Sequence, residues 1–319
     1  MKLRRILAIS AILCMTLAFA ANAADFPSRT IRLIVPFAAG GSTDLTSRII
    51  APAMSKSLKN VDIIVENRAG GGGAMAMMEL VQAAPDGHVL ALVSQNASIM
   101  TPILSDVGFT KVDIAPVAQV AELPTNVFVK ADSEVNTVAD LIRLGEKNYG
   151  KMTYSTSGTG SIHHVVAELF QHTANKKGLL THVPYNSGTE SITAVLGGHV
   201  DMAFANASYG ESYVKQQGVM KMVATTAEDE SMFPDVPTFR SLGYDVAISS
   251  WWGIVARAGT PPEILDMIDK AVKDAVADPE VGKAMENLGM PPDYIGRTDF
   301  TIKYLSQYDQ LGGVLAGLF

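Results

Sequence analysis

The sequence predicts a two-lobed α/β protein in which each lobe is a mainly parallel sheet flanked by helices, with a hinged cleft between the lobes. Three observations predict this fold. Strand-like and helix-like segments alternate along the chain, two extended stretches interrupt the alternation, and glycine-rich loops join strands to helices. Alternation of this kind is typical of βαβ units and of sheets whose strands are largely parallel.

The individual elements follow from the period of the apolar residues, which is 3.6 in helices and 2 or less in buried strands. The predicted helices are 45–58, 74–83, 138–147, 162–172, 190–196, 262–277, 281–288 and 298–311. The predicted strands are 31–35, 61–65, 89–93, 117–120, 126–129, 152–155, 180–183, 202–205 and 221–225.

Two extended stretches, 117–130 and 247–256, break the alternation and are predicted to carry the chain from one lobe to the other and back. This assigns residues 24–124 and 228–319 to the first lobe, and residues 125–227 to the second. Ligands of open α/β sheets bind at the carboxyl ends of the strands, so the loops from strand to helix are the expected site of function.

The start of the chain has a basic segment, then an apolar run at 6–20, then Ala21-Asn22-Ala23. This order predicts a secretory signal peptide at 1–23, cleaved near Ala23, and therefore a periplasmic protein. The single cysteine, Cys14, would leave with the signal, so no disulfide or thiol chemistry is expected.

The formal net charge of −7 becomes −10 once the three basic residues of the signal are removed. An acidic protein repels nucleic acid, so no nucleic-acid partner is expected. The sequence contains no H-E-x-x-H motif, no G-x-S-x-G motif and no phosphate-binding G-x-x-x-x-G-K-[ST] loop. We therefore expect no cofactor, no metal and no enzymatic activity, and a monomeric protein.

Two loops, 36–44 and 155–161, follow a strand, open a helix and are rich in Gly, Ser and Thr. Glycines allow main-chain amides to approach a ligand closely, and the first turn of a helix offers unpaired amides at the positive end of its dipole. Neither loop contains Lys or Arg. One such loop in each lobe predicts that a small carboxylate is bound in the cleft by uncharged donors, chiefly main-chain amides and hydroxyl groups.

The predicted ligand-binding residues come from these loops and from the ends of neighbouring strands. They are Phe37, Ala39, Gly40, Gly41, Asp44, Ser94, Asn96, Ser157, Gly158, Thr159, Gly160, Ser161, His164, Tyr185 and Asn206.

Other interpretations stay open at this point. The glycines of either loop could form an ordinary turn, and Asp44 could cap the first helix or accept a hydrogen bond from a ligand amine or a water. Ser161 and His164 lie near one helix start and leave open a periplasmic hydrolase. The same fold could also serve as the ligand sensor of a membrane receptor.

The ordered motifs of the chain resemble those of the Bug-type extracytoplasmic solute-binding proteins of tripartite tricarboxylate transporters. The matching segments are Phe26-Pro27 with 31–37, Gly40-Gly41-x-x-Asp44, 65–68 with the following glycines, 84–87, Tyr154-x-x-x-Gly158-x-Gly160-Ser161-x-x-His164, 182–185, 196–200, 234–238, Trp252-Gly253 and 258–262. Each motif is weak alone, and ten of them in order along the mature chain are specific.

The resemblance implies a type II periplasmic-binding fold that closes like a clam shell around a di- or tricarboxylate or an aromatic acid. It also implies delivery of the ligand to a large and a small membrane subunit. The chain departs from the family pattern at Ala69, where proline is frequent, and at Ala205, where aspartate is frequent. It departs again at Asn186, where a basic residue or glycine is frequent. The resemblance places Ala205 and Asn186 near the distal pocket, so these two departures concern the ligand's second functional group.

Overall fold

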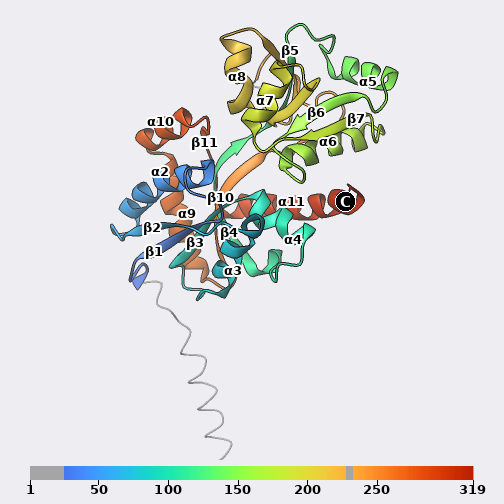
Figure 1. Cartoon of the computed structure of the whole chain (residues 1–319). Helices are drawn as coiled ribbons and strands as arrows, with labels where there is room; N and C mark the ends of the chain where they lie inside the picture. The colour runs from blue at the N-terminus through green and yellow to red at the C-terminus, as the bar shows by residue number, and fades with distance from the viewer. Residues whose placement is uncertain (1–24, 228–232, 319) are drawn as a thin grey trace, which may run out of the picture.

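The computed structural model describes residues 25–227 and 233–318 (Figure 1). The predicted signal peptide, 1–23, lies outside the described residues. In the described part of the chain, no helix has the length and apolar character needed to cross a bilayer.

The strands form two separate sheets, one in each lobe (Figure 1). The first sheet has the order β11-β4-β10-β3-β1-β2, and the second has the order β7-β6-β8-β5-β9. The strands of the first sheet are β1 (Ile31–Val35), β2 (Ile63–Asn67), β3 (Val89–Ser94), β4 (Ile114–Leu123), β10 (Ser250–Arg257) and β11 (Pro292–Ile295). Those of the second are β5 (Thr125–Lys130), β6 (Met152–Thr156), β7 (Leu180–Pro184), β8 (Met202–Asn206) and β9 (Met220–Thr225).

Helices cover both sheets. Around the first sheet they are α2 (Ser42–Ser57), α3 (Ala74–Gln82), α4 (Thr101–Leu104), α9 (Pro262–Val276), α10 (Pro279–Asn287) and α11 (Arg297–Leu318), with short turns η2 (Gly71–Gly73), η3 (Asn96–Met100) and η4 (Lys111–Asp113). Around the second sheet they are α5 (Val138–Lys147), α6 (Ile162–Thr173), α7 (Gly188–Leu196) and α8 (Ala207–Lys215).

The chain changes sheets at two places. β4 ends at Leu123 in the first sheet and β5 begins at Thr125 in the second, so Pro124 is the first crossing. The return lies between β9 and β10. Most strands of each sheet point in one direction, but β5 in the second sheet and β10 and β11 in the first run opposite to the rest.

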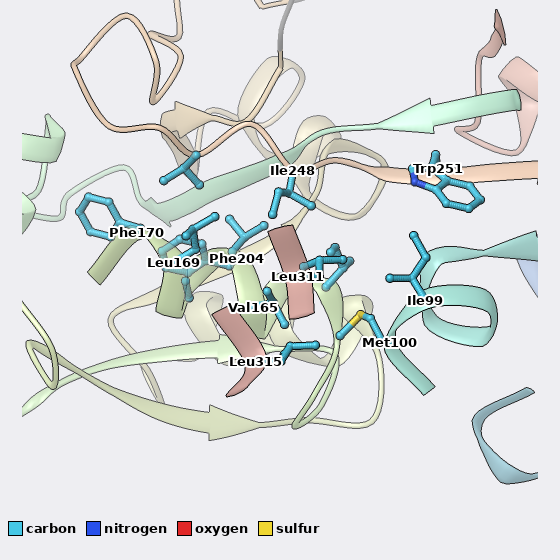
Figure 2. Close-up of a cluster of buried hydrophobic side chains, with 14 of the residues drawn as sticks. Ile99, Met100, Val165, Leu169, Phe170, Phe204, Ile248, Trp251, Leu311 and Leu315 are labelled. Carbon is cyan, nitrogen blue, oxygen red and sulfur yellow. The ribbon is translucent and has the colours of Figure 1, made fainter. Parts of the chain in front are cut away.

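The C-terminal helix α11 lies between the two lobes (Figure 1). Its first half packs on the first lobe, where Trp251 contacts Phe300 edge to face with ring centroids 5.1 Å apart. Its last turns bring Leu311 and Leu315 into a cluster with residues of α6 in the second lobe (Figure 2). One hydrophobic core therefore extends through both lobes.

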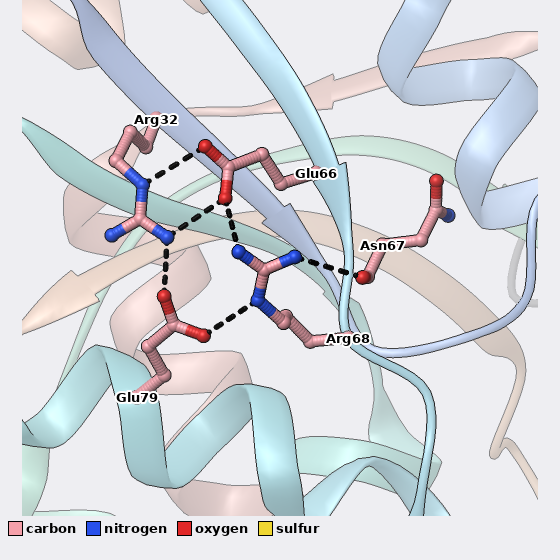
Figure 3. A network of polar contacts seen from close by, with 5 residues as sticks. All are labelled: Arg32, Glu66, Asn67, Arg68 and Glu79. Atoms are coloured by element: carbon pink, nitrogen blue, oxygen red, sulfur yellow. Dashed lines mark hydrogen bonds and ion pairs between the residues drawn. The ribbon is translucent and has the colours of Figure 1, made fainter.

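A network of charged side chains fixes the end of β2 near the predicted anion loop (Figure 3). Arg32 binds Glu66 with both Nε and Nη2, at 3.0 and 2.8 Å, and Glu79 bridges Arg32 and Arg68. The hydrogen bonds from Arg32 hold the pKa of Glu66 below its usual range, although burial opposes this. The network joins β1, β2 and α3 into one rigid support.

Candidate functional site

The first predicted loop is exposed, and its shape is set by Asp44. Residues 38–42 are exposed, whereas Asp44 is buried in the first turn of α2. The Asp44 carboxylate accepts hydrogen bonds from the amide of Gly40 at 2.8 Å, from Arg48 Nε at 3.0 Å and from Asn67 Nδ2 at 3.0 Å. Burial alone would raise the pKa of Asp44, but these three donors together lower it below its usual value. Asp44 therefore acts as an internal anchor for the loop.

Helix α2 begins without a side-chain cap. Its N-cap is Gly41, which has no side chain to offer, and the first helical hydrogen bond runs from Leu45 to Gly41. The amides of the first turn, from Ser42 onward, have no partner within the helix and point along its positive dipole end. This start can bind an anion through main-chain donors.

Helix α8 in the second lobe also begins without a side-chain cap, although its N-cap, Asn206, is of a type that often caps helices. The Asn206 side chain is used elsewhere. Its Oδ1 accepts a hydrogen bond from Ser250 Oγ at 3.3 Å and lies 3.0 Å from His163 Nε2. The first-turn amides of α8 are therefore left for another acceptor.

The two uncapped starts meet at one cavity between the lobes, with a volume of about 260 Å³. This volume lies at the small end of ligand pockets, which typically hold about 300–1,000 Å³. The lining residues come from α2, the end of β4, the start of α8, β10 and the segment after α10. They are Ser42, Leu45, Leu123, Asn206, Ser208, Tyr209, Trp252, Leu288 and Met290, none of which is charged.

The second predicted loop, 155–161, satisfies many of its own donors. The Gly158 amide donates to Thr156 Oγ1 at 3.2 Å, and the Gly160 amide donates to His164 Nδ1 at 3.1 Å. The Ser161 hydroxyl caps α6 by accepting from the His164 amide. The prediction that both loops offer free glycine amides is thus modified, because the amides of Gly40, Gly158 and Gly160 all have partners within the protein.

A chain of hydrogen bonds connects the second loop to the cavity. Ser157 Oγ lies 2.8 Å from His163 Nδ1, and His163 Nε2 reaches Asn206, which lines the cavity. Ser250 of the first lobe bonds the same amide oxygen. Burial lowers the pKa of His163, so its ring is neutral and can accept at one nitrogen and donate at the other. Ser157 therefore contributes to the shape of the site through His163. The sequence predicts His164 as the ligand-binding histidine, and His163 was not predicted.

The remaining predicted residues are distributed over both lobes. Ser94 pairs with Trp252 across the first sheet, and Asn96 begins η3. The Tyr185 amide donates to Thr156 O at 3.1 Å, which places Tyr185 beside the second loop. Of the predicted set, Asn206 lines the cavity, and the roles of the others in binding stay predictions. Phe37 packs on the core at the base of the first loop.

The Ser161 hydroxyl and the His164 ring both bond to main-chain groups near the start of α6. The Ser161 hydroxyl bonds the His164 main chain, and the His164 ring accepts from Gly160 and stacks on His182 with centroids 4.0 Å apart. Among the described residues, no group of three or more His, Cys, Asp or Glu side chains is placed to hold a metal ion.

Three neighbouring histidines of the second lobe should make the protein sensitive to mild acid. Burial lowers the pKa of His163 and His164, and burial together with the nearby His164 lowers the pKa of His182 to about 4. An unfolded histidine titrates near pH 6.5. The unfolded chain thus binds protons more readily than the folded protein between pH 6.5 and 4. The contribution of the neutral histidines to stability is fully present above pH 6.5 and is lost as the pH falls through this window.

We expect the free energy of unfolding in urea to be lower at pH 5.0 than at pH 7.5. The variant His182→Phe should lose less stability between the two pH values than the natural protein, whatever its stability at pH 7.5. An equal loss in the two proteins would show that His182 does not contribute to the pH dependence.

The sequence profile described as "Tripartite tricarboxylate transporter family receptor" (TctC) matches residues 46–310. The chain belongs to this family. It is 34% identical over 283 residues to the UPF0065 protein in the gbd 5' region of Cupriavidus necator, covering 88% of this chain and 84% of the relative. It is 27% identical to the protein BugT of Bordetella pertussis, covering 92% and 90% of the two chains.

Solved structures share the fold. A TctC solute-binding protein from Polaromonas, without ligand, matches with a TM-score of 0.84 and 27% identity, over 92% of this chain and 99% of that chain. MatC from Rhodopseudomonas palustris, with bound malate, matches with a TM-score of 0.68 and 25% identity, over 90% and 100%. The two-lobed type II fold of the Bug-type receptors is thus confirmed.

Proposed function

We propose that this TctC-family receptor is a periplasmic solute-binding protein that captures a small carboxylate between the starts of α2 and α8 and delivers it to the membrane subunits of a tripartite transporter. The observation that carries the proposal is the cavity between the lobes, where two uncapped helix starts meet and no lining side chain is charged. Helix starts of this kind are suited to carboxylates because amides and helix dipoles both favour negative charge.

The relatives support the ligand class and the compartment. MatC holds malate, a carboxylate, and BugD, which matches with a TM-score of 0.69 and 25% identity, is described as a periplasmic binding protein. The cavity lies between the lobes and is lined by residues of both, so we expect the lobes to close on the ligand.

A thermal-shift screen of mono-, di- and tricarboxylates tests the proposal. A ligand at 100 times its Kd should stabilise the protein by about 2.7 kcal/mol, which corresponds to a rise in Tm of about 5 °C for a protein of this size. The radius of gyration from X-ray scattering should fall when that ligand is added, because the lobes close. If no carboxylate raises the Tm, the protein is not a carboxylate receptor.

The variant Ser42→Pro tests the role of the main-chain donors. Proline is well accepted at the first position of a helix, and Gly41 before it already has the extended conformation that proline requires. The substitution deletes one amide donor, and Ser42→Ala deletes only the hydroxyl. Since a hydrogen bond to a charged group is worth about 1.5–3 kcal/mol, Ser42→Pro should weaken binding about 10- to 100-fold relative to Ser42→Ala. Equal affinity in both variants would remove the α2 amide of Ser42 from the site.

A further inference from the structure

The walls of the cavity identify the chemical class of its ligand more narrowly than the family does. Five of the lining residues are apolar and share the cavity with the two helix starts. They are Leu45, Leu123, Trp252, Leu288 and Met290. We propose that the ligand is a monocarboxylate with an apolar body, such as a short aliphatic or an aromatic acid. This inference rests on the proposed function and concerns the same cavity.

The available positive charge matches one carboxylate and not two. Each helix start is equivalent to about half an elementary charge, so the starts of α2 and α8 together supply about one. The nearby guanidinium of Arg48 is paired with Asp44 and adds no net charge. A second carboxylate would therefore lose its water of hydration against the apolar walls without gaining a charged partner, which is strongly unfavourable.

The apolar wall is held in place before the ligand arrives. Trp252 Nε1 donates to Thr43 Oγ1 at 3.1 Å, and Thr46 Oγ1 donates to the sulfur of Met290 at 3.6 Å. Both donors and acceptors are buried, and Thr43 and Thr46 belong to the helix whose start faces the carboxylate. One helix thus positions the anion site and the apolar surface together, which fixes the distance between the two ends of a ligand.

Tyr209 completes the wall from the second lobe. Its ring lies against the main chain of Gly188, so closely that a Cβ at Gly188 would meet ring carbons at 2.4 Å. Burial raises the pKa of Tyr209, and its phenol therefore stays neutral at physiological pH. The ring adds apolar surface and one uncharged hydroxyl, which again provides no partner for a second anion.

Two matched series of acids test the inference by calorimetric titration of the full mature chain. In the series acetate, butyrate, hexanoate, the affinity should rise about fourfold for each added methylene, equivalent to about 0.8 kcal/mol, until the cavity is filled. Hexanoate and adipate have the same six carbons and differ by the second carboxylate. Hexanoate should bind at least tenfold more tightly than adipate.

The variant Leu45→Arg provides the converse test, because Leu45 lines the cavity and is partly exposed, so that a longer charged side chain fits without burial. Leu45→Arg should raise the affinity for adipate relative to hexanoate at least tenfold, because a cation is gained for the second carboxylate and one apolar wall residue is lost. Leu45→Met keeps the wall apolar and should keep hexanoate the tighter ligand. If the natural protein binds adipate more tightly than hexanoate, the inference is wrong and the receptor function stands. If no acid of either series binds, and none raises the Tm, the proposed function itself fails.

Discussion

Replacing Trp251 by alanine is expected to destabilise the protein by about 3–5 kcal/mol, because the indole is fully buried where α11 packs on β10. The ring contacts Phe300 and Tyr304 of α11 edge to face, and its Nε1 donates to Gln307 Oε1 at 2.6 Å. The alanine variant leaves a cavity and also a buried amide oxygen without its donor. Unfolding in guanidinium chloride, followed by tryptophan fluorescence and circular dichroism, measures the loss.

The same variant should loosen the contact between the lobes, since α11 carries Leu311 and Leu315 to the second lobe. Trp251→Phe is the matched control: it keeps most of the apolar volume, loses only the bond to Gln307, and should cost clearly less. A loss below 1 kcal/mol in Trp251→Ala would show that α11 is not anchored through this ring.

Replacing Asp44 by alanine is expected to cost about 2–3 kcal/mol of stability and to weaken carboxylate binding at least tenfold. The substitution removes the acceptor shared by the Gly40 amide, Arg48 and Asn67, and the loop before α2 loses its anchor. Water can reach Arg48 and the loop, which limits the cost. Urea unfolding and calorimetric titration of the same preparation give the two quantities.

The pH dependence of the unfolding free energy distinguishes the effect of the Asp44 charge from the effect of its size. Its pKa is lower in the folded protein than in the unfolded chain, so its stabilisation is present above about pH 4 and is lost as the pH falls through the folded pKa. Asp44→Asn keeps the size of the side chain and should lose this part of the acid sensitivity. The difference in unfolding free energy between the natural protein and Asp44→Asn should therefore be largest at neutral pH and shrink as the pH falls below 4, and equal unfolding free energies at pH 7 would contradict the anchor role.

Much of the architecture could be predicted from apolar periodicity, because most helices have one buried face and most strands are continuous apolar runs. The extended stretch 117–130 gives β4 and β5, which lie in different sheets as a crossing requires. Helix α8 was missed. Its residues include two tyrosines, a glycine and two serines at 207–215, so no apolar stripe marks it, and the helix forms because Tyr209 and Gly210 pack on the second lobe.

The sequence predicts that the last helix ends at residue 311. Two consecutive glycines follow this residue, and glycine is unfavourable inside a helix. α11 continues to Leu318 because Leu315 is buried against the second lobe, and tertiary packing overrides the local preference. The cavity shows the same limit. On its α2 side, Ser42 and Leu45 lie next to the predicted Gly-rich residues but were not themselves predicted, and Trp252, Leu288 and Met290 come from distant segments that only the folded chain brings to one wall.

The central claim is that one carboxylate lies between the starts of α2 and α8. A crystal structure of the mature protein with bound hexanoate, or with the tightest acid of the screen, tests it most directly. We predict carboxylate oxygens within hydrogen-bond distance of first-turn amides of both helices, with the hydrocarbon against Trp252 and Met290. A carboxylate held instead by a Lys or Arg side chain, or by one lobe alone, would contradict the account.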